Sequence, residues 1–243
     1  NTSITLNVSG VFTLPGTYNA NVTVHSTVGN VALQSDIVVI TRTTQTATTL
    51  AYGDVLVDST KHDTLKIYAT GTDATIVSAI TKAGLFASDY TIQLPSGITL
   101  PYTINSGDSL SVFVMFTPKD IEQRGAAITL SLNRNSPCAE FQTVQLNGRG
   151  TQPIIDVRSR TLALGRVCVG NTIDTTIEIR NQGNAPLNVT RIVASGNSNF
   201  TISPLDVPVV MPDSAKQVRV RYTPVDVGNH STSLTIQSNG KWI

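Results

Sequence analysis

Apolar and polar side chains alternate along most of this chain, with the period of two that a half-buried β-strand requires. The clearest case is segment 18–24, which places Tyr18, Ala20, Val22 and Val24 on one face. Similar short runs recur between turns rich in glycine, proline and asparagine. Segments rich in Ala, Glu and Lys, which favour helices, are absent, and we therefore expect an all-β fold with almost no helix.

One strand pattern occurs twice in nearly the same form. Val112–Pro118 reads VFVMFTP and Val218–Pro224 reads VRVRYTP, and a weaker copy stands at Val11–Pro15. Proline has a fixed φ and no N–H, so Pro118 and Pro224 are predicted to end these strands. Matching segments lie about 106 to 112 residues apart, the length of one immunoglobulin-like domain. We therefore predict tandem seven-stranded immunoglobulin-like β-sandwiches.

The repeat register divides the chain into four parts. Residues 1–42 match the last three strands of a preceding repeat, and residues 43–49 are polar and predict a linker. Residues 50–150 predict a complete domain, and residues 151–243 predict a domain without its last strand. Both ends therefore suggest a piece of a longer protein.

Three finer expectations follow from this register. Segment 162–170 repeats the opening strand 50–57, and the glycines and proline of Asn147–Pro153 predict a hinge between domains. The core is expected on the inward faces of the two sheets. Its candidates are Val112, Val114, Phe116, Leu130, Val218, Val220, Tyr222 and Ile236.

The second repeat resembles a known family. Residues 162–239 read Leu-x-x-Gly-x-Val-x-Val-Gly, then Ile-x-Ile-x-Asn-x-Gly-Asn-Ala-Pro-Leu, then Val-x-Val-x-Tyr-Thr-Pro, then Gly and Leu-x-Ile-x-Ser-Asn. This is similar to bacterial choice-of-anchor D domains, relatives of the Hydin-type and major-sperm-protein-like immunoglobulin folds. The first repeat departs from the pattern where Asp58 replaces the usual glycine and Ala69 the usual asparagine. The resemblance implies tandem arrays on large secreted or surface proteins of bacteria, and it carries over no catalytic residue.

The motif positions have structural roles in this interpretation. They are Gly53, Gly71, Pro118, Gly165, Gly183 and Pro224. Gly71 and Gly183 are expected in turns that need a positive φ, and Asn181 or Asn239 is expected to bind turn backbone through its side chain.

Composition and charge argue against several functions. A net charge of +1, with 14% charged residues and scattered Lys and Arg, gives no surface for nucleic acid. No apolar run approaches the length of a membrane span, so membrane insertion is not expected. His25, His62 and His230 lack metal spacing, and Asp54, Asp58 and Asp63 fit a solvated face. We therefore predict no catalytic residue, no metal and no cofactor.

Two cysteines, Cys138 and Cys168, allow at most one bridge within the chain. Each predicted domain holds one of them, so a bridge within a domain is excluded. A Cys138–Cys168 bond would require the domains to fold back on each other, and the sequence leaves it open without favouring it.

These observations favour a non-enzymatic structural or adhesive module, a spacer or stalk, in a large extracellular or cell-surface bacterial protein. Its partners would be other domains of the same protein or other surface proteins. One alternative is a homopolymeric filament in which a strand from one chain completes a domain of another. A second alternative is a set of accessory domains of a secreted enzyme.

Overall fold

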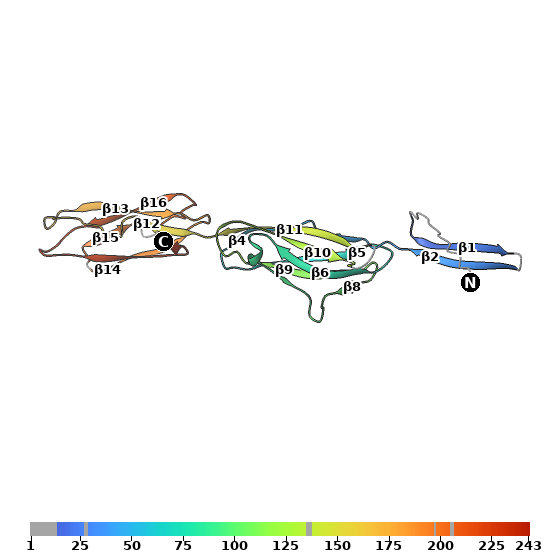
Figure 1. Cartoon of the computed structure of the whole chain (residues 1–243). Coiled ribbons are helices and arrows are strands. Elements are labelled where there is room, and N and C mark those ends of the chain that lie inside the picture. Colours follow the sequence, from blue (N-terminus) through green and yellow to red (C-terminus); the bar gives the residue numbers. More distant parts are fainter. Residues whose placement is uncertain (1–13, 27–28, 135–137, 197, 205–206) are drawn as a thin grey trace. The chain divides into compact units, whose positions relative to one another are not determined.

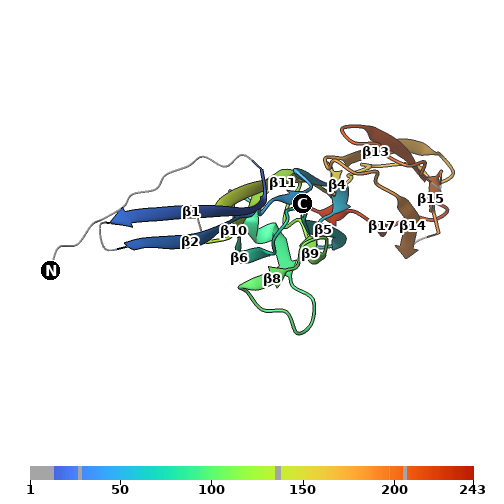
Figure 2. The ribbon, with the colours of Figure 1, turned by 90° about the vertical axis from the view of Figure 1, so that its right-hand side faces the viewer.

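The computed structural model of the chain describes residues 14–26, 29–134, 138–196, 198–204 and 207–243, and they form an all-β structure. The first of the three strands expected in residues 1–42, at residues 4–9, lies outside these residues. In the opening part, β1 (Gly16–Ser26) pairs antiparallel with β2 (Gly29–Val39), and Figures 1 and 2 show them as two long adjacent strands. Two β-sandwiches follow, and each is described separately below.

The first sandwich consists of two sheets with strand orders β4-β11-β10-β6-β8 and β3-β5-β9-β7. The strands are β3 (Thr44–Thr46), β4 (Thr49–Leu56), β5 (Lys61–Ala69), β6 (Thr75–Ala83), β7 (Tyr90–Gln93), β8 (Tyr102–Ile104), β9 (Ser109–Phe116), β10 (Glu122–Leu132) and β11 (Glu140–Thr151). A short 3₁₀ turn, η1 (Ala87–Asp89), precedes β7. The sheets hold five and four strands where alternation predicts about seven, because it does not show the three-residue strands β3 and β8.

The second sandwich repeats most of this plan. Its strands are β12 (Ile154–Val157), β13 (Ile173–Asn181), β14 (Val189–Gly196), β15 (Phe200–Ser203), β16 (Ala215–Tyr222), β17 (Thr232–Ser238) and β18 (Lys241–Trp242). One sheet has the order β15-β16-β13-β12-β18, and the other is the pair β14-β17. By position in the repeat, β12, β13, β16 and β15 correspond to β3, β5, β9 and β7, while β14 and β17 correspond to β6 and β10.

The predicted core agrees closely with the observed burial. Of the eight candidates, seven are at most 9% exposed, and they come from β9, β10 and β16. The exception is Ile236 on β17, which is only partly buried. Burial of alternate positions along these strands removes their apolar faces from water, which supplies most of the stability of each sandwich.

Each Thr-Pro pair follows the end of a strand and forms hydrogen bonds with a neighbouring turn. Strands β9 and β16 end at Phe116 and Tyr222. The next proline carbonyls accept hydrogen bonds, Pro118 from the Asp58 N–H and Pro224 from the Gly170 N–H, both at 2.9 Å. Thr117 and Thr223 add hydroxyl contacts at 2.8 and 2.9 Å, to Thr60 and Thr172 respectively.

Asp58 occupies the position of the usual glycine without changing the turn. Its φ is +62°, and that of Gly170 is +81°. The left-handed conformation is therefore kept in both sandwiches, since aspartate tolerates it better than most side chains do.

Candidate functional site

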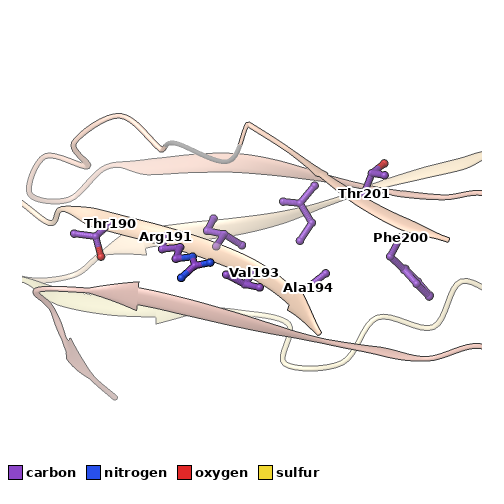
Figure 3. A pocket seen from close by; sticks show the side chains of 8 residues that line it. Thr190, Arg191, Val193, Ala194, Phe200 and Thr201 are labelled. Atoms are coloured by element: carbon purple, nitrogen blue, oxygen red, sulfur yellow. The ribbon is translucent and has the colours of Figure 1, made fainter. Parts of the chain in front are cut away.

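A groove of about 480 Å³ lies between β14 and β15 in the second sandwich. Figure 3 shows Thr190, Arg191, Val193 and Ala194 on one side and Phe200 and Thr201 on the other. Arg191 is the one ionisable side chain in the lining, so the groove offers no acid–base pair. Among the described residues, no group of three or more His, Cys, Asp or Glu side chains could hold a metal.

A more specific arrangement occurs where the chain enters each sandwich. We call residues 71–73 and 183–184 the junction turns, because each holds the backbone of the incoming segment. Gly183 lies so close to this segment that a Cβ there would be 2.0 Å from the Gln152 carbonyl oxygen. At Gly71 the corresponding distance, to the Thr41 carbonyl oxygen, is 2.3 Å. A side chain would displace backbone at either position.

Similar hydrogen bonds surround both glycines, although the backbone donor is one residue farther from the glycine in the first sandwich. In the second sandwich the Asn184 N–H donates to the Gln152 carbonyl at 3.1 Å, and the Gln152 N–H donates to Asn184 Oδ1 at 2.8 Å. In the first sandwich the Thr41 N–H donates to Thr72 Oγ1 at 3.0 Å, and the Thr41 carbonyl accepts from Asp73 at 3.1 Å. Because bonds form in both directions, the entering segment is held at a fixed register.

Asn181 reinforces the second junction turn. Its side chain is fully buried, and Oδ1 accepts from the N–H groups of Gly183 and Ile154 at 2.9 and 3.3 Å. Its amide nitrogen donates to the Ala185 and Val210 carbonyls at 2.8 and 2.9 Å. One side chain therefore bonds four backbone groups, and among these the Val210 carbonyl also accepts from the Leu187 N–H at 3.0 Å.

The first junction turn uses charge instead, because Ala69 replaces that asparagine. Arg42 donates to Asp73 Oδ2 from Nε and from one terminal nitrogen, at 3.0 and 2.8 Å. The hydrogen bond from Arg42, followed by a backbone hydrogen bond from Ala74, holds the pKa of Asp73 below its usual value. The two junctions thus share the close approach of a glycine to the entering backbone but differ in side-chain chemistry.

The structure corrects the expected role of two glycines. Gly71 and Gly183 are not among the residues with a positive φ; Gly53 and Gly165 are, at +65° and +71°. No atom lies within 4 Å of a Cβ at Gly53 or Gly165. Glycine is therefore required at positions 71 and 183 because other backbone approaches closely. At positions 53 and 165 it is favoured because the φ angle is positive.

The segments predicted as hinge and linker are also more ordered than their composition indicates. Asn147–Thr151 is the end of β11, and residues 44–46 form β3, which pairs with β5. Gly148 and Gly150 are buried, and a Cβ at these positions would lie 2.4 Å from the Phe116 ring and 1.9 Å from the Asp120 carbonyl oxygen. These two glycines permit close packing. Composition alone does not distinguish this role of glycine from a role in a flexible segment.

A third feature is the edge of the second sandwich at β17. Residues 162–169 were expected to form a strand like β4, and none is present there. In the first sandwich β4 is bonded to β11, and β11 to β10. Among the described residues, β17 has only β14 as a strand neighbour, so segment 162–169 has no counterpart of β11 to pair with.

The two cysteines do not form the bridge that the sequence left open. Both are thiols; Cys138 is partly buried, and Cys168 is exposed in the segment before β13. The described residues contain no helix with the length and apolar character that a membrane span requires.

Comparisons with known proteins support the fold. Residues 153–242 match the family model described as HYDIN/CFA65/VesB-like, Ig-like domain. This match supports the Hydin-type part of the expected resemblance, and the choice-of-anchor D assignment stays a prediction. No curated protein matched the sequence.

Several solved structures are similar to the chain. The VesB protease of Vibrio cholerae is 15% identical, with a TM-score of 0.36 over 44% of this chain and 31% of that chain. Three immunoglobulin domains of titin are 10% identical, with a TM-score of 0.41 over 94% of this chain and 74% of that chain. The Escherichia coli chaperone DraB is 11% identical, with a TM-score of 0.33 over 82% and 93%. The chain therefore spans about a third of the VesB chain that it matches.

Sequence reasoning missed the residues that hold the junctions. Thr72 and Asn184 bond the entering segment, and Arg42 pairs with Asp73. A signal was present in the repeat register, because Thr72 and Asn184 occupy the same position after the glycine and both carry a side-chain oxygen. The pairing of Arg42 with Asp73, 31 residues away, left no such signal.

Proposed function

We propose that the chain is a non-catalytic structural module, a spacer or stalk within a larger secreted or cell-surface bacterial protein. Its partners would then be neighbouring domains of that protein or other surface proteins. The observation that carries this proposal is the junction turn, which occurs in both sandwiches with a glycine packed against the entering carbonyl and with hydrogen bonds in both directions.

The connection between the sandwiches supports the same proposal. β11 ends at Thr151 and β12 begins at Ile154. The Thr151 carbonyl accepts from Val57 at 2.9 Å, and Gln152 is held by Asn184. Both sides of this short connection are therefore hydrogen-bonded to folded structure.

A distance measurement tests this function. Spin labels are placed at Lys66→Cys and Arg219→Cys, two exposed strand positions, in a chain whose native cysteines are replaced by serine. A spacer gives one narrow distance distribution. The matched control inserts four Gly-Ser residues after Gln152, which lengthens the connection and broadens the distribution. A parent distribution as broad as that of the control would overturn the proposal.

A further inference from the structure

Strand β17 is bonded on one side only within the described residues, whereas its counterpart β10 lies between β6 and β11. An unpaired strand edge presents a row of backbone donors and acceptors that can pair with another strand. Here the unpaired edge coincides with a strip of apolar side chains that are incompletely buried.

Apolar side chains at this edge are less buried than the side chains at the matching positions of the first sandwich. On β10, Ile128 and Leu130 are fully buried, whereas their counterparts Leu234 and Ile236 on β17 are partly exposed. The same change occurs along the opening segment. There, Leu50, Tyr52 and Val55 are buried, and Leu162, Leu164 and Val167 are partly exposed. In the first sandwich β11 lies between these two rows.

The chemistry of β11 shows what this edge accepts. Its inward side chains are Val144 and Leu146, both fully buried, followed by Gly148 and Gly150. Phe116 leaves no room for a Cβ at Gly148, and Asp120 leaves none at Gly150. The pattern of the strand is therefore apolar-x-apolar-x-Gly-x-Gly.

The second sandwich also has an aromatic ring at the position that excludes a side chain at Gly148. Tyr222 stands at the position of Phe116, and its ring stacks on Phe200 at 4.6 Å between centroids. Its hydroxyl is 2.8 Å from His230 Nδ1, within hydrogen-bond distance. Two contacts thus fix the ring, so it cannot move aside for a larger residue in an added strand.

We propose that the β17 edge is an acceptor for one β-strand with the pattern apolar-x-apolar-x-Gly-x-Gly, which lies between β17 and segment 162–169. This goes beyond the spacer function and does not depend on it. Strand β2 of a second copy does not fit, because the register that aligns Thr41 with Gln152 puts Ile37 and Val39 at the glycine positions. The occupant is therefore a strand that carries both glycines of this pattern, as β11 does.

A synthetic peptide of residues 139–151 tests the proposal with the full chain. Binding is followed by amide hydrogen exchange of residues 232–238, and affinity by titration. We expect protection of alternate β17 amides, those that face the open edge. A peptide with Gly148→Val and Gly150→Val should bind at least tenfold more weakly. The matched control carries Thr143→Val and Asn147→Val, at exposed positions of β11, and should bind like the parent peptide.

Three outcomes would overturn the proposal. One is the absence of β17 protection at saturating peptide, and another is equal affinity of the Gly→Val peptide. The third is a dimer of the chain alone, detected by sedimentation, in which the β17 amides are already protected, because a second copy would then cover the edge. Protection confined to residues 122–132, which form β10, would also overturn the proposal. The peptide would then have replaced β11 in the first sandwich and would not have bound at β17.

Discussion

The substitution Gly183→Ala separates close approach from backbone conformation as the reason for a glycine. The added Cβ would lie 2.0 Å from the Gln152 carbonyl oxygen, and an ordinary contact begins near 3.4 Å. The backbone must therefore separate by about 1.4 Å. That movement breaks the pair of hydrogen bonds between Gln152 and Asn184, now 2.8 and 3.1 Å long.

The expected cost combines two contributions. Overpacking costs about 1–3 kcal/mol, and two lost hydrogen bonds cost about 1 kcal/mol each. We therefore expect a loss of about 3–5 kcal/mol in the free energy of unfolding of the second sandwich. For a unit of this size, that lowers the Tm by on the order of 10–40 °C.

Gly165→Ala is the matched control in the same sandwich. Its φ is +71° and no atom lies within 4 Å of the added Cβ, so the cost is conformational only, about 1 kcal/mol. Trp242, the one tryptophan of the chain, lies in β18 and pairs with β12, so its fluorescence during urea unfolding reports on the second sandwich. Gly71→Ala should shift the circular dichroism transition and leave the Trp242 midpoint unchanged. Equal costs for Gly183→Ala and Gly165→Ala would refute the reasoning.

Three further predictions concern single side chains. Gly148→Ala places a Cβ 2.4 Å from the Phe116 ring, which itself packs against Tyr52, and should destabilise the first sandwich by about 1–3 kcal/mol in thermal unfolding. Asn181→Ala removes one hydrogen bond from each of four backbone groups, of which the Val210 carbonyl keeps its bond from the Leu187 N–H, and should cost about 3 kcal/mol, measured by the Trp242 transition; a cost below 1 kcal/mol would contradict the network. The lowered pKa of Asp73 means that its pairing with Arg42 stabilises the fold above the unfolded-state pKa, about 3.9, and that this contribution is lost as pH falls through the lower folded-state pKa. The stability difference between the parent and Arg42→Gln should thus be constant above about pH 5 and vanish in stronger acid, whereas an unchanged difference at pH 2 would contradict the pairing.

The fold class could be predicted from sequence because it rests on local alternation and on the repeat. Val112, Val114 and Phe116 alternate with outward positions, and burial follows that alternation. The segment 162–169 could not be assigned in this way. It has the pattern of β4 but forms no strand, because a strand also needs a bonded neighbour, and β11 supplies that neighbour only to the first sandwich.

The glycines show a second limit of sequence reasoning. The repeat indicates that Gly71 and Gly183 matter, but a sequence does not show which atom approaches the missing side chain. Here that atom belongs to a residue about 30 positions earlier in the chain. For the same reason Gly148 and Gly150 resembled a hinge. A sequence does not distinguish a glycine that lets a neighbouring group pack closely from a glycine that makes the backbone flexible.

The positions where the two repeats differ indicate what the repeat preserves. Asp58 and Gly170 share a left-handed conformation, and Thr72 and Asn184 share a bond to the entering backbone. At a third position Ala69 replaces Asn181, and an ion pair at Asp73 accompanies the change. At the first two positions the side-chain chemistry varies, while the turn conformation and the side-chain bond to the entering backbone are kept. This variation is compatible with the proposed spacer, whose role depends on the geometry of the chain.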